Sequence, residues 1–294
     1  MSEQSAAAGL PALLRLDQVG TDRWCSAAQS VQSVPGEPLG LLGARAMVAA
    51  GHTVDTDWRW VHSVHLSQLA VSPENSAGNN APDTGYRVER LRDDAHLSTR
   101  LVHVTAGDTA LAAVTVSFQV PRRGTGPSYQ AAEPPELPDP HGLPDPHGLP
   151  GAGPAGPIDV RHLGPGRRRS WLRVTEELPD RILAHTAALA LATDLVLPPP
   201  DAAGYRDLDT GHPLRPVVVD RVLRVHRSFR ADDWVLYEHE SPSASDYRTY
   251  ATGRFYSSMG RLIASVDEQA VLVPDPVAEA VGDTPMAVGA RKGA

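Results

Sequence analysis

The sequence predicts an α+β fold of two similar units, in each of which an antiparallel sheet wraps around one long apolar helix. One observation behind this prediction is the charge-poor run Arg181–Pro198, whose only acid is Asp194. The other is that a helix followed by a meander of strands occurs twice in the 294 residues, on either side of a Pro- and Gly-rich block. A helix that is apolar all round is a buried one, and a repeated unit implies two copies packed side by side.

The run Arg181–Pro198 carries the signals of a complete helix. Pro179 and Asp180 stand where a first turn should begin, because a missing N–H costs nothing there and an acid suits the positive helix end. The proline triplet at 198–200 must end the helix. A lone carboxylate on a buried helix is costly unless it is paired or used, so Asp194 is the first candidate functional residue.

The first half of the chain is predicted to hold a second buried helix and four strands. After a loose tail over 1–8 and a short amphipathic piece at Leu10–Leu16, the small-residue-rich segment Leu39–Gly51 forms the helix. A hairpin turn at Gly107-Asp108 joins the last two strands. The four strand-like segments are 58–71, 85–92, 97–105 and 109–120.

Residues 121–166 differ from the rest of the chain. They include 12 Pro and 9 Gly, and the sequence LPDPHG occurs twice in tandem, at 137–142 and 143–148. Such a composition cannot bury enough apolar surface to fold, which predicts a linker. The repeated Asp-x-His resembles a metal-binding tract, but prolines prevent a preformed cage. No metal site and no cofactor are predicted.

The second half repeats the first. A strand leads into the helix at 179–194, and a hairpin turn at 258–260 joins the last two of four further strands. The chain is therefore divided into an N-terminal unit (1–120), a linker (121–166), a C-terminal unit (167–275) and a flexible tail (276–294). The strands are expected at 170–176, 217–226, 234–240, 248–257 and 261–273.

Composition excludes several classes of protein. A net charge of −8 argues against nucleic acid or an anionic membrane as the main partner. The single cysteine, Cys25, beside Trp24, allows no internal disulfide; it is expected to be a packed residue in a reducing, cytoplasmic environment. The N-terminus lacks the features of a signal peptide, and no apolar run reaches the ~18 residues that a membrane span needs.

Stretches in both halves resemble the type II acyl-CoA thioesterases, which are double hot-dog proteins. The resemblance implies hydrolysis of a fatty acyl-CoA by a bound water, with no metal and no acyl-enzyme. It also implies a site made of an Asp at the end of the second helix, a Thr or Ser just before an Asp-His on the next strand, and a Gln on the last strand. The matching stretches are 61–73, 86–100, 116–119, 169–174, 178–198, 225–229, 233–245 and 251–266.

The family positions fall on particular residues here. Asp194 matches the family's Asp, whereas the hydroxyl position falls on Val218 and the Gln position on Glu268. The family's His is Arg221. A shift of one residue would bring Gln269 to the Gln position, but strand alternation puts Glu268 on the apolar face. The family's Gly-Gly-Gln near the first helix is reduced to Leu42-Gly43-Ala44.

These residues allow a restricted chemistry. Thioester hydrolysis needs a water deprotonated near the carbonyl and donors for the oxyanion. Asp194 could be the base, and Glu268, if close, would share a proton with it and could act as an acid. The alternatives are a buried Asp194 that caps a neighbouring element and a Glu268 that turns to solvent.

Other candidates have simpler explanations. His62 and His65 share a strand, but the family carries His there without a metal, so packing is expected. The basic run 167–169 fits either the phosphates of CoA or a solvated loop. The hot-dog hydratase motif needs a His five residues after its Asp, and Pro199 stands there.

Three functions remain open at this point. The first is an acyl-CoA thioesterase with an atypical site, the second an acyl-thioester enzyme of another reaction type in a biosynthetic pathway, and the third a non-catalytic acyl-binding protein. The expected partner is an acyl-CoA or a carrier-bound acyl thioester. A homo-oligomer is expected as well, because hot-dog units bury sheet edges by pairing.

Overall fold

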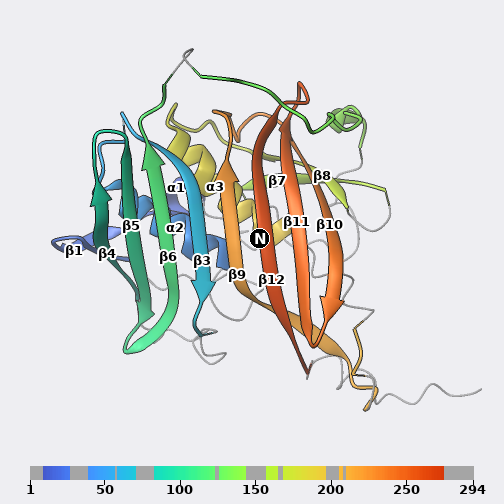
Figure 1. The fold of residues 1–294 in the computed structure, drawn as a ribbon, viewed down its shortest axis with the longest axis horizontal. Helices are drawn as coiled ribbons and strands as arrows, with labels where there is room; N and C mark the ends of the chain where they lie inside the picture. Colours follow the sequence, from blue (N-terminus) through green and yellow to red (C-terminus); the bar gives the residue numbers. More distant parts are fainter. Residues whose placement is uncertain are drawn as a thin grey trace, which may run out of the picture.

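A computed structural model describes residues 9–26, 39–56, 58–70, 83–122, 126–143, 157–164, 168–196, 205–207 and 210–274. Its centre is one 12-stranded antiparallel sheet with the order β1-β2-β4-β5-β6-β3-β9-β12-β11-β10-β8-β7. Two long helices, α2 and α3, lie together on one side of this sheet (Figure 1). The predicted fold class, a double hot-dog, is confirmed.

Apart from the short helix α1, the two halves of the chain have the same order of long helix and strands. The first consists of α1 (Leu10–Leu13), β1 (Asp17–Gly20), β2 (Arg23–Ser26), α2 (Leu39–Gly51), β3 (Trp60–Gln68), β4 (Thr84–Asp93), β5 (Leu97–Ala106) and β6 (Thr109–Gln119). The second consists of β7 (Ile158–Leu163), β8 (Arg169–Val174), α3 (Ile182–Val196), β9 (Leu214–Val225), β10 (Val235–Ser245), β11 (Arg248–Ser257) and β12 (Leu262–Pro274). Each half orders its six strands in the sheet in the same way.

A single pair of strands joins the halves. β3 and β9 run antiparallel, with Val64 opposite Leu223 near the middle of the paired stretch. The sequence predicts two sheets, and this pair merges them into one. A strand at the edge of a sheet exposes a row of unpaired N–H and C=O groups. β3 and β9 would each be such an edge if the halves had separate sheets, so their pairing removes two edges.

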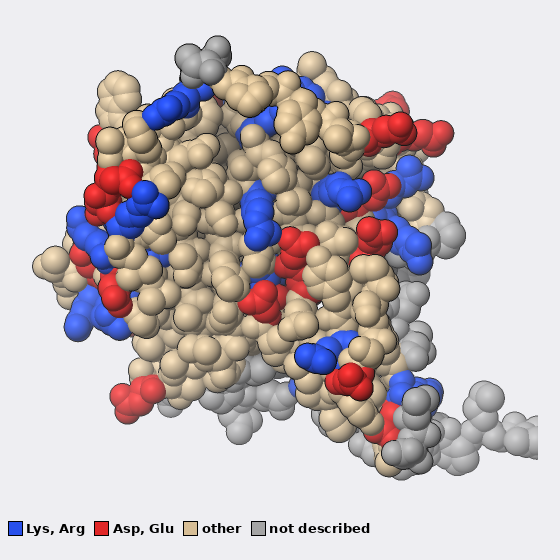
Figure 2. Space-filling model, viewed as in Figure 1, with Lys and Arg blue, Asp and Glu red and all other residues tan. Residues whose placement is uncertain are grey.

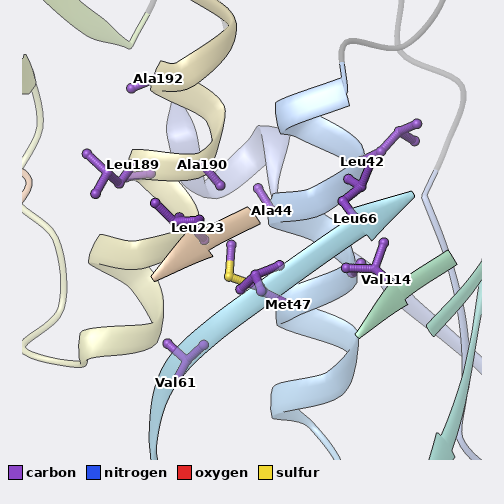
Figure 3. Packing of buried hydrophobic residues seen from close by; sticks show 14 of the residues in the cluster. Leu42, Ala44, Met47, Val61, Leu66, Val114, Leu189, Ala190, Ala192 and Leu223 are labelled. Atoms are coloured by element: carbon purple, nitrogen blue, oxygen red, sulfur yellow. The ribbon is translucent and has the colours of Figure 1, made fainter. Parts of the chain in front are cut away.

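Small residues let the helices approach closely. α2 and α3 run antiparallel, since Gly40 at the start of α2 meets Asp194 near the end of α3, and Gly51 at the end of α2 meets Leu183. In Figure 3, Ala44 and Ala190 lie between the helices. Larger side chains fill the space toward the strands, among them Met47, Leu66, Val114 and Leu223.

The boundaries differ from the prediction in several places. α3 begins at Ile182 and not at Pro179, and β1 and β2 were not predicted. A larger correction concerns the predicted linker, because Ile158–Leu163 forms β7 and pairs with β8. Composition over a long window hid this short apolar segment. The tails at 1–8 and 276–294, the proline triplet and most of the second LPDPHG copy lie outside the described residues.

The segment 126–143 of the predicted linker also packs on the sheet. Figure 1 shows it in green, crossing the upper edge of the molecule from β6 toward β8. Gln130 accepts from Leu262 N at 2.8 Å and donates to Gly260 O at 3.0 Å, and Arg227 donates to Tyr129 O at 3.0 Å. A few such contacts suffice because proline already restricts the unfolded chain.

The outer face of the sheet carries mixed charges. Figure 2 shows acidic and basic side chains interspersed there. Examples are Arg224 with Asp267 at 3.0 Å and His65 with Asp220 at 2.6 Å. No helix in the described part of the chain is long and apolar enough to cross a bilayer.

Candidate active site

The ends of three elements bring Asp194, Arg221 and Glu268 together. Asp194 lies in the last turn of α3, Arg221 on β9 and Glu268 on the neighbouring strand β12. Arg221 is opposite Glu268 in the β9–β12 pair. All three side chains are largely buried, with exposed fractions of 15%, 8% and 11%. The sequence predicts Asp194 and Glu268 as site residues. Arg221 draws attention there only because the resemblance implies a histidine at its position.

Asp194 is bound through both carboxylate oxygens. Its Oδ1 accepts from Arg221 Nη1 at 2.6 Å, and its Oδ2 accepts from the backbone N–H of Gly40 at 2.6 Å. Gly40 belongs to the first turn of α2, where free N–H groups and the helix dipole favour an anion. The absence of a side chain at Gly40 is required, since a Cβ there would lie 2.3 Å from Ala190 O and 2.6 Å from Asp194 Oδ2.

Arg221 forms the bridge of the cluster. Its Nε and Nη2 lie 2.8 and 2.7 Å from Glu268 Oε2, and its Nη1 also donates to Thr193 Oγ1 at 2.7 Å. Burial disfavours the charge of this guanidinium, but Glu268 and Asp194 outweigh that effect and raise the pKa of Arg221. Burial is also the main influence on Glu268 and raises the pKa of its carboxyl group, against the opposing charge of Arg221.

The inward position of Glu268 follows from strand alternation. Glu268 shares the inner face of β12 with the buried residues Val266 and Ala270, whereas Gln269 is exposed. A register shift opposite Gln269 and Ala270 brings Val218 of β9 against the core next to Ala270. The position at which the sequence resemblance implies a hydroxyl is therefore apolar, and the side chain of Val218 offers no hydrogen bond to a water.

A buried phenol lies near the same cluster. Tyr237 on β10 is fully buried, and its hydroxyl group has no hydrogen-bond partner among the residues that the structure describes. The ring lies over Gly253, where a Cβ would come within 2.4 Å of the hydroxyl oxygen. Burial raises the pKa of Tyr237, and the charge of Glu268 adds to the effect. Sequence analysis does not single out this residue, because a tyrosine in an apolar strand is usually part of the core.

The other candidates lie away from the cluster. His65 is on the outer face, paired with Asp220, and His62 is half-buried, with its pKa lowered by burial. Arg169 begins β8, Arg168 directly precedes this strand, and Arg167 is outside the described residues. Cys25 is half-buried in β2, and burial raises the pKa of its thiol. Within the described ranges, no group of three His, Cys, Asp or Glu could hold a metal.

Two cavities open at the opposite end of α3. One of 340 Å³ is lined by Thr56, Trp60 and His185, and the other, of 360 Å³, by Arg227, Trp234 and Met259. Neither includes Asp194, Arg221 or Glu268. We locate the candidate site by its buried polar cluster and not by cavity size, because desolvated, mutually interacting carboxylates are what acid–base chemistry requires.

The arrangement can supply a base, a positive donor and a support for that donor. Asp194 is a carboxylate at the start of one helix and the end of another, Arg221 offers N–H groups in an interior of low dielectric constant, and Glu268 holds the guanidinium in place. Donors in such surroundings stabilise a developing oxyanion better than they would in water.

Comparisons with known proteins identify the family of this chain. Residues 121–273 match the family model described as the acyl-CoA thioesterase C-terminal domain. This range includes Asp194, Arg221 and Glu268. The acyl-CoA thioesterase 2 of Haemophilus influenzae is 28% identical over 259 residues, which cover 79% of this chain and 86% of the relative.

Solved structures show the same fold. The acyl-CoA thioesterase II TesB2 of Mycobacterium marinum has a TM-score of 0.70 and 27% identity, covering 91% of this chain and 98% of that one. A tesB protein of Mycobacterium avium subspecies paratuberculosis has a TM-score of 0.71 at 21% identity and covers 90% and 98% of the two chains.

Proposed function

Because the chain belongs to the acyl-CoA thioesterase family, we propose that it hydrolyses an acyl-CoA to the free acid and CoA at the cluster of Asp194, Arg221 and Glu268. The observation that supports this proposal is the position of Asp194. Its carboxylate lies between the end of α3 and the first turn of α2, bound to Gly40 N–H at 2.6 Å. The sequence resemblance implies the family's base at this position, which lies within the range that the family model matches.

The proposed mechanism gives each of the three charged groups a role. Asp194 takes a proton from a water that attacks the thioester carbonyl. Arg221 donates to the oxyanion that forms. Collapse of the intermediate breaks the C–S bond, and the thiolate of CoA takes the proton from Asp194. Glu268 positions Arg221 through Nε and Nη2.

A thiol-release assay tests the proposal. Wild-type protein should release CoA from a panel of acyl-CoA substrates, and Asp194→Asn should lower the rate by roughly 10²–10⁴ because it removes the base and keeps the shape. Thr193→Ser, which keeps the hydroxyl bonded to Arg221, is a matched control. Unchanged turnover in Asp194→Asn would refute the role of Asp194.

A second function is favoured by one observation. Both oxygens of Asp194 are already bonded, and Val218 cannot orient a water. This closed arrangement suits a protein that binds acyl groups without cleaving them, or that acts on a carrier-bound acyl thioester in another reaction. Carrier-protein thioesters are therefore included in the panel, and binding of acyl-CoA with no thiol release from any substrate would favour the binding function.

A homo-oligomer belongs to the same proposal. The sheet ends at β1 and β7, and edge strands in proteins are commonly paired or covered. Analytical ultracentrifugation over a range of concentrations should show a dimer or larger species. A monomer at all concentrations would contradict this part of the proposal.

A further inference from the structure

A row of aromatic and apolar side chains crosses the outer face of the C-terminal half. Trp171 on β8 is opposite Leu236 on β10, and Leu236 is opposite Tyr256 on β11. These three residues are almost fully buried and form a cluster separate from the main core, with Trp234 packed against it. We call these four residues the aromatic cradle.

The first LPDPHG copy occupies the aromatic cradle. The indole Nε1–H of Trp171 donates to Pro138 O at 2.9 Å, and the ring of His141 meets Trp234 edge-on at 6.1 Å between centroids. Leu137 and Leu143, which begin the two copies, both pack against the row. An indole N–H that binds a carbonyl of a proline-rich segment is the way in which aromatic-lined grooves recognise such peptides.

If the chain were moved by six residues along the aromatic cradle, a residue of the same type would take each of these contact positions. The chain reads LPDPHGLPDPHGLP from Leu137 to Pro150. After the shift, Leu143 replaces Leu137, Pro144 replaces Pro138, His147 replaces His141 and Leu149 replaces Leu143. We propose that the aromatic cradle is a recognition site for this sequence and that the second tandem copy, 143–148, is its alternative occupant.

The connection to β7 is long enough for the shift. Leu163, at the far end of the six-residue strand β7, packs against the same row as Leu143. Ile158 at the near end therefore lies about 20 Å from that row. The residues from 150 to 157 would remain as the connection, and eight extended residues reach about 27 Å.

We call the placement of the first copy in the aromatic cradle the first register and the placement of the second copy the second register. The structure has the first register because no extra residues must loop out in it. In the second register, six extra residues must loop out after Pro134, which lies against Gly260. The entropy cost of a loop rises only slowly with its length. The second copy should therefore occupy the aromatic cradle once the first copy is disabled, while the first copy predominates in the wild-type chain.

Matched double variants separate the two registers. Leu137→Ser/His141→Ser removes side chains that only the first register uses, and His147→Ser/Leu149→Ser removes those that only the second uses. Hydrogen exchange of the Trp171 indole N–H, followed by NMR, reports occupancy. The signal is assigned through Trp171→Phe or, if that variant does not fold, through nuclear Overhauser contacts with Leu236.

Each double variant should keep the Trp171 indole protected, and the quadruple variant should exchange at least about tenfold faster. Loss of protection in Leu137→Ser/His141→Ser to the level of the quadruple variant would show that the second copy cannot bind. Protection in the quadruple variant would show that the sequence is not recognised. Protection of Leu137→Ser/His141→Ser that rises with protein concentration would identify a segment from another chain as the occupant. Each of these three results overturns the proposal.

Discussion

Arg221 lies where the sequence resemblance implies a histidine, and its guanidinium group binds two carboxylates, those of Asp194 and Glu268. Strand alternation predicted that Glu268 faces inward with Val266 and Ala270. The bridge itself could not be predicted, because it depends on where α3 ends relative to β9 and β12. Arg221 and Glu268 are chemically matched, since the positive charge of one lies 2.7 Å from the carboxylate of the other.

Removal of this positive charge should leave two buried carboxylates facing each other. We expect Arg221→Gln to lower the free energy of unfolding by about 3–5 kcal/mol at pH 8. The loss should shrink as pH falls, because the raised pKa of a carboxylate in the pair lets the folded protein take up a proton before the unfolded chain does. Urea unfolding at pH 8 and pH 5.5 measures both effects. In Arg221→Gln/Glu268→Gln most of the stability should return, and equal losses in the single and double variants would argue against the bridge.

At the scale of elements, the long periodic segments were predicted well and the short ones poorly. Leu39–Gly51 matches α2 at both ends because a small-residue-rich run ends in Gly51. By contrast, β1, β2 and β7 have only four to six residues. Such strands gain their stability from neighbours in the sheet and not from their own sequence.

The contact between α2 and α3 gives a matched pair of glycine variants. Gly40→Ala should destabilise the protein by about 1–3 kcal/mol because its Cβ would meet Ala190 O and the Asp194 carboxylate. Gly43→Ala should be nearly neutral, since its Cβ would meet only the end of Leu66 at 3.1 Å and alanine favours the helix. Thermal unfolding and thiol release should both fall in Gly40→Ala alone. Similar behaviour of the two variants would contradict a specific fit at Gly40.

We expect protonation of His185 on α3 to make the stability of the folded protein depend on pH. Its Nδ1 accepts from Ala231 N at 3.1 Å, and burial lowers its pKa, with Asp232 opposing and Arg230 adding to the shift. Asp180 and Asp233 are the other charges near it. Because the folded pKa is below the unfolded value, stability is full above about pH 6.5 and declines as pH falls through that value.

The comparison of wild type with His185→Gln tests this coupling, because Gln offers an acceptor to Ala231 but does not titrate. Between pH 7.5 and 5.5 the melting temperature of wild type should fall further than that of the variant. The remaining histidines serve as an internal reference, since they are the same in both proteins. Parallel curves would show that His185 does not contribute.

In the whole molecule, duplication of a helix-and-strand unit explains the fold. A difference between the two ends of the α2–α3 pair explains where the candidate site lies. The two halves share one order of long helix and strands, yet the contacts between the helices differ at the two ends of the pair. Asp194 faces Gly40 at that end, whereas Gly51 faces Leu183 at the other. The sequence revealed the repeat because helix and meander recur. It did not reveal that one sheet joins the halves, because the β3–β9 pair bridges residues far apart in the chain.

The shared sheet predicts how a cut chain behaves. A specific protease site inserted after Pro150 would give two fragments that should co-elute on size exclusion, because β3 pairs with β9 and α2 packs on α3. The N-terminal fragment also keeps the segment at 126–143, whose Pro138 accepts from Trp171 of the other fragment. The uncut protein with the same insertion is the control. Urea should separate the fragments only where the uncut protein unfolds, and separation in buffer alone would mean that the central strand pair does not hold the two halves together.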